Sequence, residues 1–211
     1  VVASVGVATP PAVLYSGPRS SGLDTLTYPV IVKPVAESSG IGIDAGSVVS
    51  SATEARDRCE RIVERYRQPA LAESFVSGVE IEVPLIIDAS PLALGAVAIT
   101  LDGVPVSEDR FLTGALVYDD TYGFADPPPQ VDTRRAILAA EESARILGIR
   151  DYGRVDFRVA PDGTPWFIEA SSHPHIQRPS SFFFLARRRG LAFSAMLHEI
   201  LVIAAKRRMH S

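Results

Sequence analysis

The sequence has little cysteine and no long apolar run or basic block, and each shortage excludes a class of protein. Cys59 is its one cysteine, so no internal disulfide can form, which fits a reducing compartment. The longest apolar runs, 181–186 and 200–205, are far shorter than the roughly 20 residues of a membrane helix. A formal net charge of −4 and the lack of a long basic block argue against a nucleic-acid surface. We therefore predict a cytoplasmic protein that binds neither membranes nor nucleic acids.

The composition is otherwise that of a globular protein. Of the 211 residues 46% are hydrophobic and 22% are charged, and a chain of this length can bury a core without disulfides. The chain begins at Val1 with neither a methionine nor a signal-peptide pattern, so we expect a piece of a longer protein.

The order of the segments predicts an α+β fold with antiparallel sheets. Short strands bounded by turn residues are expected at 12–16, 29–35, 70–76, 79–87, 91–103, 104–111, 154–160 and 165–171. Helices are expected at 51–68, opened by a capping box of Ser51 and Glu54, at 132–147, ended by Gly148, and near 192–206. Asp102-Gly103 is the clearest hairpin signal, and His198 and His210 are predicted to be ordinary helix residues. Residues 112–131 show no period, which is typical of a functional lid or a disordered segment.

The strongest physical argument lies in the hairpin around a predicted two-residue turn at 162–163. Its register places Asp156 opposite Glu169 and Arg154 opposite Ser171, and all four lie on one face because side chains alternate along a strand. The opposite face is apolar and consists of Val155, Phe157, Val159, Trp166 and Ile168.

Two carboxylates that face each other destabilise a sheet unless something offsets their repulsion. A Mg²⁺ ion bound by Asp156 and Glu169, with water and substrate phosphate completing its shell, would do so. Screening by Arg154 and Arg158 on a solvated face would do so as well. From this hairpin alone both explanations stay open.

Two further motifs suggest a nucleotide. Lys33 lies in an apolar strand directly before a loop of serines and glycines at 37–42, and such loops offer N–H groups and hydroxyls to phosphate. Glu73 and Glu80 flank a bend that includes Val76, where carboxylates and backbone could bind adenine and ribose. Taken singly, a flexible surface turn and edge-strand charges that prevent aggregation are the simpler interpretations.

Together the motifs resemble the ATP-grasp superfamily, most closely its D-alanine–D-alanine ligase-like branch. The resemblance runs from about Val7 to the end through blocks in the family's order, at 6–14, 28–43, 71–83, 154–174 and the closing helix. It implies an α+β, ATP-grasp fold in which two α+β subdomains, 1–78 and 79–211, hold the nucleotide between antiparallel sheets. It also implies that 112–131 is a mobile loop that closes on the site.

The resemblance implies a role for each motif residue. For the nucleotide these are Lys33 at the phosphates, the covering loop with Glu37, Ser38, Ser39 and Gly40, and Glu73, the Val76 backbone and Glu80 at adenine and ribose. For the metal they are Asp156, Glu169 and Ser171; for catalysis they are Arg154, which stabilises the transferred phosphoryl group, and Ser180, which holds the second substrate's carboxylate.

The implied activity is an ADP-forming ligase that makes a C–N bond and uses ATP with Mg²⁺ or Mn²⁺. A carboxylate attacks the γ-phosphate to give an acyl phosphate, and an amine then displaces phosphate to leave an amide. The expected partners are ATP and small-molecule carboxylate and amine substrates, such as amino acids or a small peptide. A homodimer is left open.

Four departures from the ligase pattern support an alternative function, a degenerate module that binds nucleotide without ligating. Ser171 stands where the family has asparagine, and Pro174-His175 stands where it has proline-glycine. No lysine occurs between Lys33 and Lys206, so the closing loop offers none to the phosphate. The amino-terminal domain of the ligases is also missing. If the chain is active, these departures favour an acceptor other than that of cell-wall dipeptide synthesis.

Overall fold

The computed structural model describes residues 1–209, and His210 lies outside the described residues. The chain divides into two compact units. The smaller unit comprises Pro10–Val76 and Arg110–Tyr122, and the larger comprises Val1–Thr9, Ser77–Asp109 and 123–209. The chain passes from the smaller to the larger unit after Val76. Residues 1–9 belong to the larger unit although they precede the smaller unit in sequence. Residues 110–122 belong to the smaller unit although they interrupt the larger unit in sequence.

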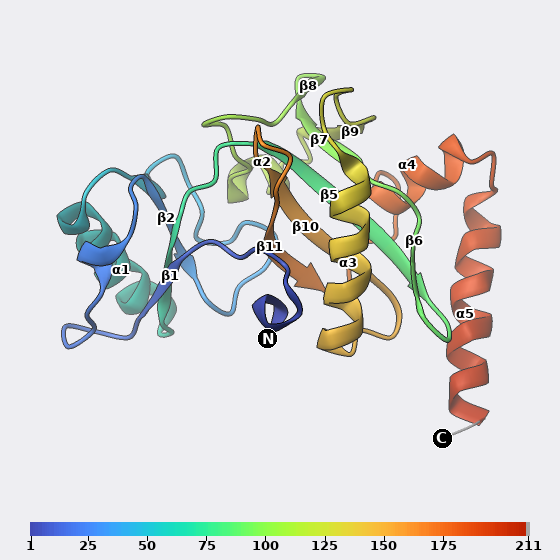
Figure 1. The fold of residues 1–211 in the computed structure, drawn as a ribbon, viewed down its shortest axis with the longest axis horizontal. Coiled ribbons are helices and arrows are strands. Elements are labelled where there is room, and N and C mark those ends of the chain that lie inside the picture. Colours follow the sequence, from blue (N-terminus) through green and yellow to red (C-terminus); the bar gives the residue numbers. More distant parts are fainter. Residues whose placement is uncertain (210–211) are drawn as a thin grey trace. The chain divides into compact units, whose positions relative to one another are not determined.

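The smaller unit is a four-stranded antiparallel sheet in the order β1-β4-β2-β3, with one long helix. Its elements are β1 (Ala12–Tyr15), η2 (Leu23–Thr25), β2 (Val30–Pro34), β3 (Val48–Val49), α1 (Ala52–Tyr66), β4 (Ala70–Ser74) and α2 (Gly114–Tyr118). Helix α1 packs on the face of the sheet that carries Val30 and Val32 (Figure 1). Because side chains alternate along β2, Lys33 lies on the opposite face.

The capping signals of α1 are confirmed with one change. The Ser51 hydroxyl accepts a hydrogen bond from the Glu54 N–H, as a capping box requires. The Glu54 carboxylate, however, accepts from the N–H of Ser50 and not from that of Ser51. The helix ends at Tyr66 with Arg67 in the left-handed region, two residues before Pro69.

The larger unit is built on a seven-stranded sheet with the antiparallel path β11-β10-β5-β7-β8, to which β6 adds antiparallel at β5 and β9 adds at β7. Its elements are η1 (Val2–Val5), β5 (Val79–Ile87), β6 (Pro91–Ala93), β7 (Val97–Leu101), β8 (Val104–Pro105), β9 (Tyr122–Ala125), α3 (Thr133–Leu147), β10 (Asp151–Val159), β11 (Pro165–Ser171), α4 (Ser181–Arg188) and α5 (Phe193–Met209). Asp132 caps α3, where the sequence favours either Asp132 or Thr133. As predicted, Gly148 ends α3 in the left-handed region, and Asp102-Gly103 forms the two-residue turn between β7 and β8.

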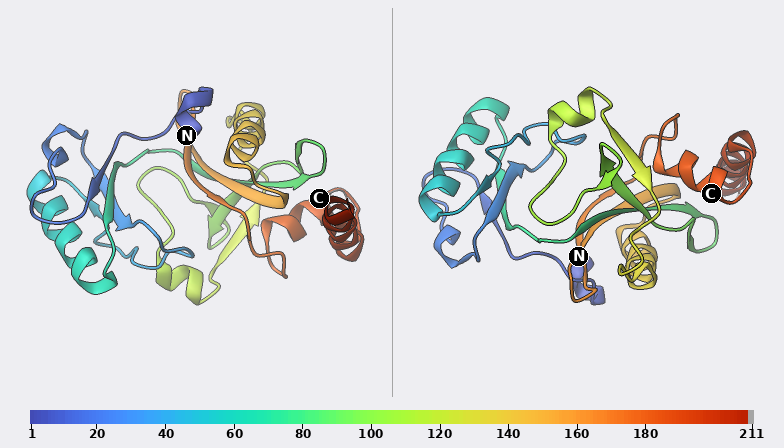
Figure 2. Two further views of the ribbon diagram at one scale, coloured as in Figure 1. Left: turned by 90° about the horizontal axis from the view of Figure 1, so that it is seen from below. Right: turned by 90° about the horizontal axis from the view of Figure 1, so that it is seen from above.

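Helices cover both faces of this sheet (Figures 1 and 2). Helix α3 packs on the face that carries Ile81, Val83, Val155 and Phe157, all fully buried. Helices α4 and α5 cover part of the other face, around Ile86. The even-numbered residues of β5 and β10 share this second face, which therefore carries Glu80, Glu82, Arg154, Asp156 and Arg158.

The hairpin between β10 and β11 differs from the predicted one in two respects that offset each other. The turn closes between Ala160 and Thr164, which leaves a three-residue loop and not the predicted two-residue one. A bulge between Asp156 and Phe157 then shifts the register by one residue, which restores the predicted pairing of Asp156 with Glu169.

As a result, the predicted pairing is confirmed at one end of the hairpin and wrong near the turn. Arg154 pairs with Ser171, as expected, whereas Phe157 pairs with Phe167 on the core side. Trp166 pairs with Arg158, so it lies on the polar side of the sheet and not on the apolar face that we expected.

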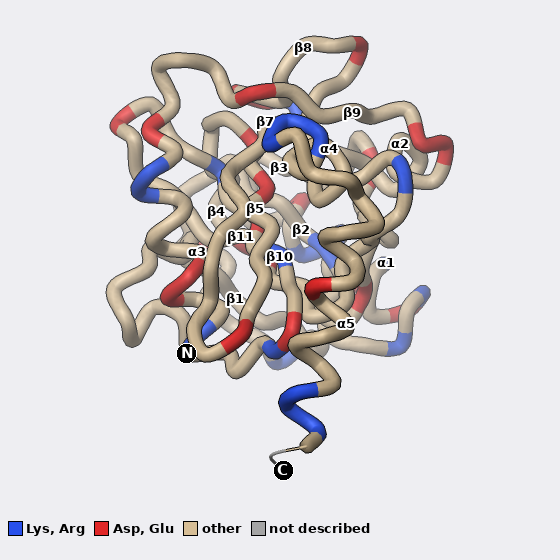
Figure 3. Tube along the Cα trace, turned by 90° about the vertical axis from the view of Figure 1, so that its right-hand side faces the viewer, with Lys and Arg blue, Asp and Glu red and all other residues tan. Residues whose placement is uncertain are grey.

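Residues 112–131 are less irregular than the sequence suggests, since they include α2 and β9. Helix α4 was not distinguished from a bare apolar run in the sequence, and α5 extends beyond the predicted 192–206 at its carboxyl end. Its last turn carries Lys206, Arg207 and Arg208, visible as the basic stretch near the C-terminal end in Figure 3. Among residues 1–209, none of the helices combines the length and the apolar character that crossing a membrane requires.

Candidate functional site

Three carboxylates form a row across the larger unit's sheet. Asp156 on β10 pairs with Glu169 on β11 to one side and with Glu82 on β5 to the other. Since directly paired residues point to the same side of a sheet, the row lies on the face opposite α3. The next partner along the row, Val97 on β7, is fully buried and apolar, so the row of acids ends there.

Arg154 contacts every member of this row. Its Nε and Nη2 donate to the two carboxylate oxygens of Asp156 at 2.7 and 2.6 Å. Its Nη1 lies 3.5 Å from Glu82 Oε1, and its Nη2 lies 3.5 Å from Glu169 Oε1. The guanidinium therefore offsets the repulsion among the three acids. Screening by arginine is one of the two explanations that the sequence leaves open, and a bound metal ion is the other.

Glu82 is the most enclosed acid of the row. The residue is 5% exposed, and its Oε2 has no hydrogen-bond partner within the described structure. Burial raises the pKa of Glu82 to about 7, although Arg154 and the Ser181 side chain oppose the shift. Glu169, by contrast, has a side chain that is 49% exposed.

A second arginine organises the neighbouring part of this face. Arg158, 5% exposed, donates through Nη2 to the carbonyls of Gly78 and Glu108 at 2.9 and 2.8 Å. Its Nη1 donates to Glu80 Oε2 at 3.2 Å. Burial nonetheless raises the pKa of Glu80 to about 7, with Arg158 acting against the shift and Asp156 adding to it. Arg158 thus holds both a candidate ribose-binding carboxylate and the bend before it.

The donor set on β10 and β11 fits a Mg²⁺ ion. No group of three or more His, Cys, Asp or Glu side chains among residues 1–209 has a metal-binding arrangement. Mg²⁺ does not need one, because it is usually bound by one or two carboxylates together with waters and substrate phosphates. Asp156 and Glu169 face each other, and Ser171 follows Glu169 on the same face. The metal assignment stays a prediction.

Ser180 occupies a structural position in addition to its predicted role. It is the N-cap of α4, where its hydroxyl accepts a hydrogen bond from the Phe183 N–H at 3.2 Å. The residue is 4% exposed. A hydroxyl that accepts in this way can still donate its own hydrogen, so its carboxylate-binding role stays a prediction.

In the smaller unit, Lys33 and Glu73 form a short ion pair. Lys33 Nζ lies 2.6 Å from Glu73 Oε1, and the two side chains are 16% and 9% exposed. Both lie on the face of the sheet opposite α1. Val76 lies two residues beyond β4, and its contact with adenine stays a prediction.

The first residue of the candidate phosphate loop is held in place by a hydrogen bond. The Glu37 carboxylate accepts a hydrogen bond from Gln68 Nε2 at 2.7 Å, and the same amide's oxygen accepts from the Ala36 N–H. Ser38 and Ser39 are exposed, and Ser39 has a positive φ of 55°. The two serines and their backbone are therefore presented to solvent from a fixed start.

The backbone of the same loop packs against the backbone at the start of α2. The Gly114 N–H donates to the Ile43 carbonyl at 2.8 Å. A Cβ added at Gly114 would lie 2.6 Å from the Gly40 carbonyl oxygen, and one added at Gly40 would lie 3.0 Å from the Gly114 Cα. Only glycine fits at both positions, so the candidate phosphate loop and the candidate lid are in direct contact.

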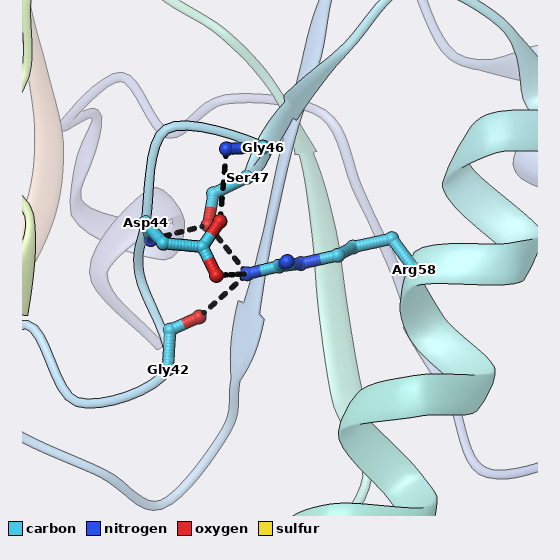
Figure 4. Close-up of polar contacts among 5 residues, drawn as sticks. All are labelled: Gly42, Asp44, Gly46, Ser47 and Arg58. Atoms are coloured by element: carbon cyan, nitrogen blue, oxygen red, sulfur yellow. Dashed lines mark hydrogen bonds and ion pairs between the residues drawn. The ribbon is translucent and has the colours of Figure 1, made fainter.

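Arg58 fastens the far end of this loop to α1 (Figure 4). Its Nη2 donates to the Gly42 carbonyl, to Asp44 Oδ2 and to the Ser47 hydroxyl, at 3.1, 2.8 and 2.9 Å. Partial burial alone would raise the pKa of Asp44, but the hydrogen bonds from Arg58 and from the Gly46 N–H lower it. The loop therefore leaves the sheet and returns to it at fixed points.

Sequence reasoning missed two side chains that the structure brings to these clusters, Glu82 and Arg58, and it considered Arg158 only as a screen for Asp156 and Glu169, whereas Arg158 bonds to Glu80. The alternation Val79-Glu80-Ile81-Glu82-Val83 places Glu82 on the same side as Glu80, and this signal was available. The pairing of β5 with β10, which lies about 70 residues further along the chain, could not be inferred from the sequence. Nor does a helix pattern show that Arg58 reaches a preceding loop.

Comparison with known proteins gives a family match over most of the chain. Residues 19–202 match the family model described as "D-ala D-ala ligase C-terminus". The chain is 34% identical over 178 residues to the D-alanine–D-alanine ligase of Anaeromyxobacter sp. strain Fw109-5, an alignment that covers 84% of this chain and 54% of that protein. The chain thus spans about half the length of the curated relatives it matches.

Solved structures agree in fold. A D-alanine–D-alanine ligase from Bacillus anthracis, complexed with ATP, superposes with a TM-score of 0.75 at 21% identity, covering 99% of this chain and 64% of that one. The VanG D-Ala:D-Ser ligase from Enterococcus faecalis gives a TM-score of 0.73 at 21% identity, covering 96% of this chain and 58% of that one. The predicted α+β, ATP-grasp fold is confirmed.

Proposed function

Because the chain belongs to the D-ala D-ala ligase C-terminus family, we propose that it is the nucleotide-binding, catalytic part of an ATP-dependent, ADP-forming carboxylate–amine ligase. The observation that carries the proposal is the row of Glu169, Asp156 and Glu82 with Arg154 beside it. A sheet face that concentrates three acids around one arginine suits a substrate with several negative charges and its counter-ion.

In this proposal Asp156, Glu169 and Ser171 hold Mg²⁺ or Mn²⁺. The ion, when bound, neutralises charge on the transferring phosphoryl group. Arg154 stabilises the same charge from the protein side, since its guanidinium lies within 3.5 Å of Glu169 and bonds directly to Asp156. Ser180, at the start of α4, donates its hydroxyl hydrogen to the carboxylate of the second substrate.

Two groups of residues are proposed to bind the nucleotide. Lys33 binds the phosphates under the loop of Glu37, Ser38, Ser39 and Gly40, while Glu73, the Val76 backbone and Glu80 bind adenine and ribose. The ion pair between Lys33 and Glu73 and the clamp of Arg158 on Glu80 support these assignments, because each orients a charged group that a nucleotide needs. The segment 112–131 would then exclude the water that hydrolyses an acyl phosphate.

The reaction follows from these roles. A substrate carboxylate attacks the γ-phosphate of ATP, which forms an acyl phosphate and releases ADP. The amine of the second substrate attacks the acyl carbon, loses a proton and displaces phosphate, which leaves an amide. The protein acts by positioning and by electrostatic stabilisation, so no covalent nucleophile is required. Cys59, fully buried between α1 and its sheet, is not part of this chemistry.

The test is phosphate release by the full-length protein that contains this chain, with ATP, Mg²⁺ and a panel of D-amino acids, L-amino acids and dipeptides. The proposal predicts that one pair of substrates raises phosphate release and yields an amide product by mass spectrometry. Binding of ATP without product from any pair would favour the degenerate module, for which Ser171, His175 and the lysine-free closing segment argue.

A further inference from the structure

The contacts of Arg154 raise a question about how a cation could reach the row of acids. Nε and Nη2 of Arg154 occupy both carboxylate oxygens of Asp156. A divalent cation bound by Asp156 needs at least one of these oxygens, and it repels the guanidinium beside it. Each oxygen keeps a further lone pair for a cation, but the repulsion between the cation and the guanidinium weakens the contact of Arg154 with Asp156 whenever a cation binds.

Glu82 is placed to receive Arg154. It stands on the side of Asp156 away from Glu169, and its Oε1 is already 3.5 Å from Arg154 Nη1. Its Oε2 is buried and has no hydrogen-bond partner among residues 1–209, and such an atom costs stability unless a donor reaches it. A buried carboxylate with an unused oxygen next to a guanidinium is a ready second partner for that guanidinium.

Building on the proposed function, we propose that Glu82 is a positioning residue that takes over Arg154 from Asp156 when a divalent cation occupies Asp156 and Glu169. The exchange keeps the arginine charge beside the site without leaving it in competition with the metal. It also assigns a use to the one acid of the row that belongs to neither the predicted metal ligands nor the predicted nucleotide contacts.

Two other roles for Glu82 make different predictions. As a direct metal ligand, Glu82 would contribute to cation affinity whether or not Arg154 is present. As a purely structural residue, it would affect stability and leave cation affinity unchanged. The three roles separate in a double-mutant cycle of Glu82→Gln and Arg154→Met.

The experiment titrates Mn²⁺ into the full-length protein saturated with adenylyl imidodiphosphate and counts free Mn²⁺ by electron paramagnetic resonance. Glu82→Gln is expected to weaken Mn²⁺ binding about tenfold, within the 5–150-fold range of typical coupling between sites. In the Arg154→Met background the same substitution is expected to change the affinity less than about twofold. Glu141→Gln, a carboxylate on α3 over the other face of the sheet, is the matched control and should leave the affinity unchanged.

Each result decides between the roles. An equal loss in both backgrounds makes Glu82 a metal ligand and overturns the inference, and so does an unchanged affinity in Glu82→Gln with Arg154 present. These two outcomes leave the proposed function standing. Failure of the unsubstituted protein to bind Mn²⁺ with the nucleotide analogue overturns the proposed function and the inference with it.

Discussion

Replacement of Arg158 by methionine should be the most destabilising single change on the polar face of the larger unit. The substitution removes a 5% exposed guanidinium that satisfies the Gly78 and Glu108 carbonyls and the Glu80 carboxylate. Breaking a buried pair typically costs about 3–5 kcal/mol, and protonation of Glu80, whose pKa is already about 7 beside Arg158, moves the expected cost to the lower end of this range. Two carbonyls that lose their donor add to this cost unless water reaches them.

The magnitude can be apportioned with a second substitution. Glu80→Gln removes the charge that Arg158→Met would leave unpaired, so the double variant should be more stable than the sum of the two single losses predicts. The expected coupling is about 1–3 kcal/mol, the range for residues in one hydrogen-bond network. Arg145→Met, which breaks an exposed ion pair with Glu142 on α3, is the matched control and should remain close to the unsubstituted protein.

The assay is equilibrium unfolding in urea at pH 7, followed by circular dichroism. A loss below about 1 kcal/mol for Arg158→Met, or strictly additive losses in the double variant, would refute the reasoning. The first result would mean that Arg158 is not a buried anchor. The second would mean that it stabilises the bend at Gly78 without acting on Glu80.

Three further predictions concern pH and the candidate phosphate loop. The folded-state pKa of Glu82 is raised from 4.5 to about 7, so the stability that its protonated form contributes is complete below about pH 4.5 and is lost as pH rises through 7. Between these two pH values, Glu82→Gln should reduce the slope of unfolding free energy against pH by up to about 1.4 kcal/mol per pH unit. Arg58→Met should release the loop from α1, seen as faster amide hydrogen exchange at residues 42–47 with exchange in β2 unchanged, and equal exchange would contradict the anchor. Gly114→Ala should force α2 away from Gly40 and weaken nucleotide binding several-fold by calorimetry, whereas unchanged affinity would show that this contact is not needed for binding.

The facing of Asp156 and Glu169 was predictable from the sequence, although one step of the reasoning was wrong. The two-residue turn does not form, and a bulge after Asp156 compensates for the longer loop. Because Phe167 and Ile168 are both apolar, alternation along β11 gives no sign of where the extra residue lies. Trp166 was assigned to the wrong face of the sheet for the same reason.

Long-range pairing accounts for most of what the sequence could not predict. Glu82 joins Asp156 only because β5 lies beside β10 in the sheet. Helix α2 escaped prediction since five residues are too few to show a helical period. Local signals were reliable where the cause is local, as at the Ser51 cap of α1 and at Gly148, which ends α3.

The most direct test of the account is ATP binding by the full-length protein with and without Mg²⁺, compared between the unsubstituted protein and Glu169→Gln. The account predicts that Mg²⁺ tightens ATP binding in the unsubstituted protein and that Glu169→Gln, which keeps the shape of the side chain and removes its charge, abolishes this dependence while the protein stays folded. Equal ATP affinity in the two proteins with Mg²⁺ present would contradict it.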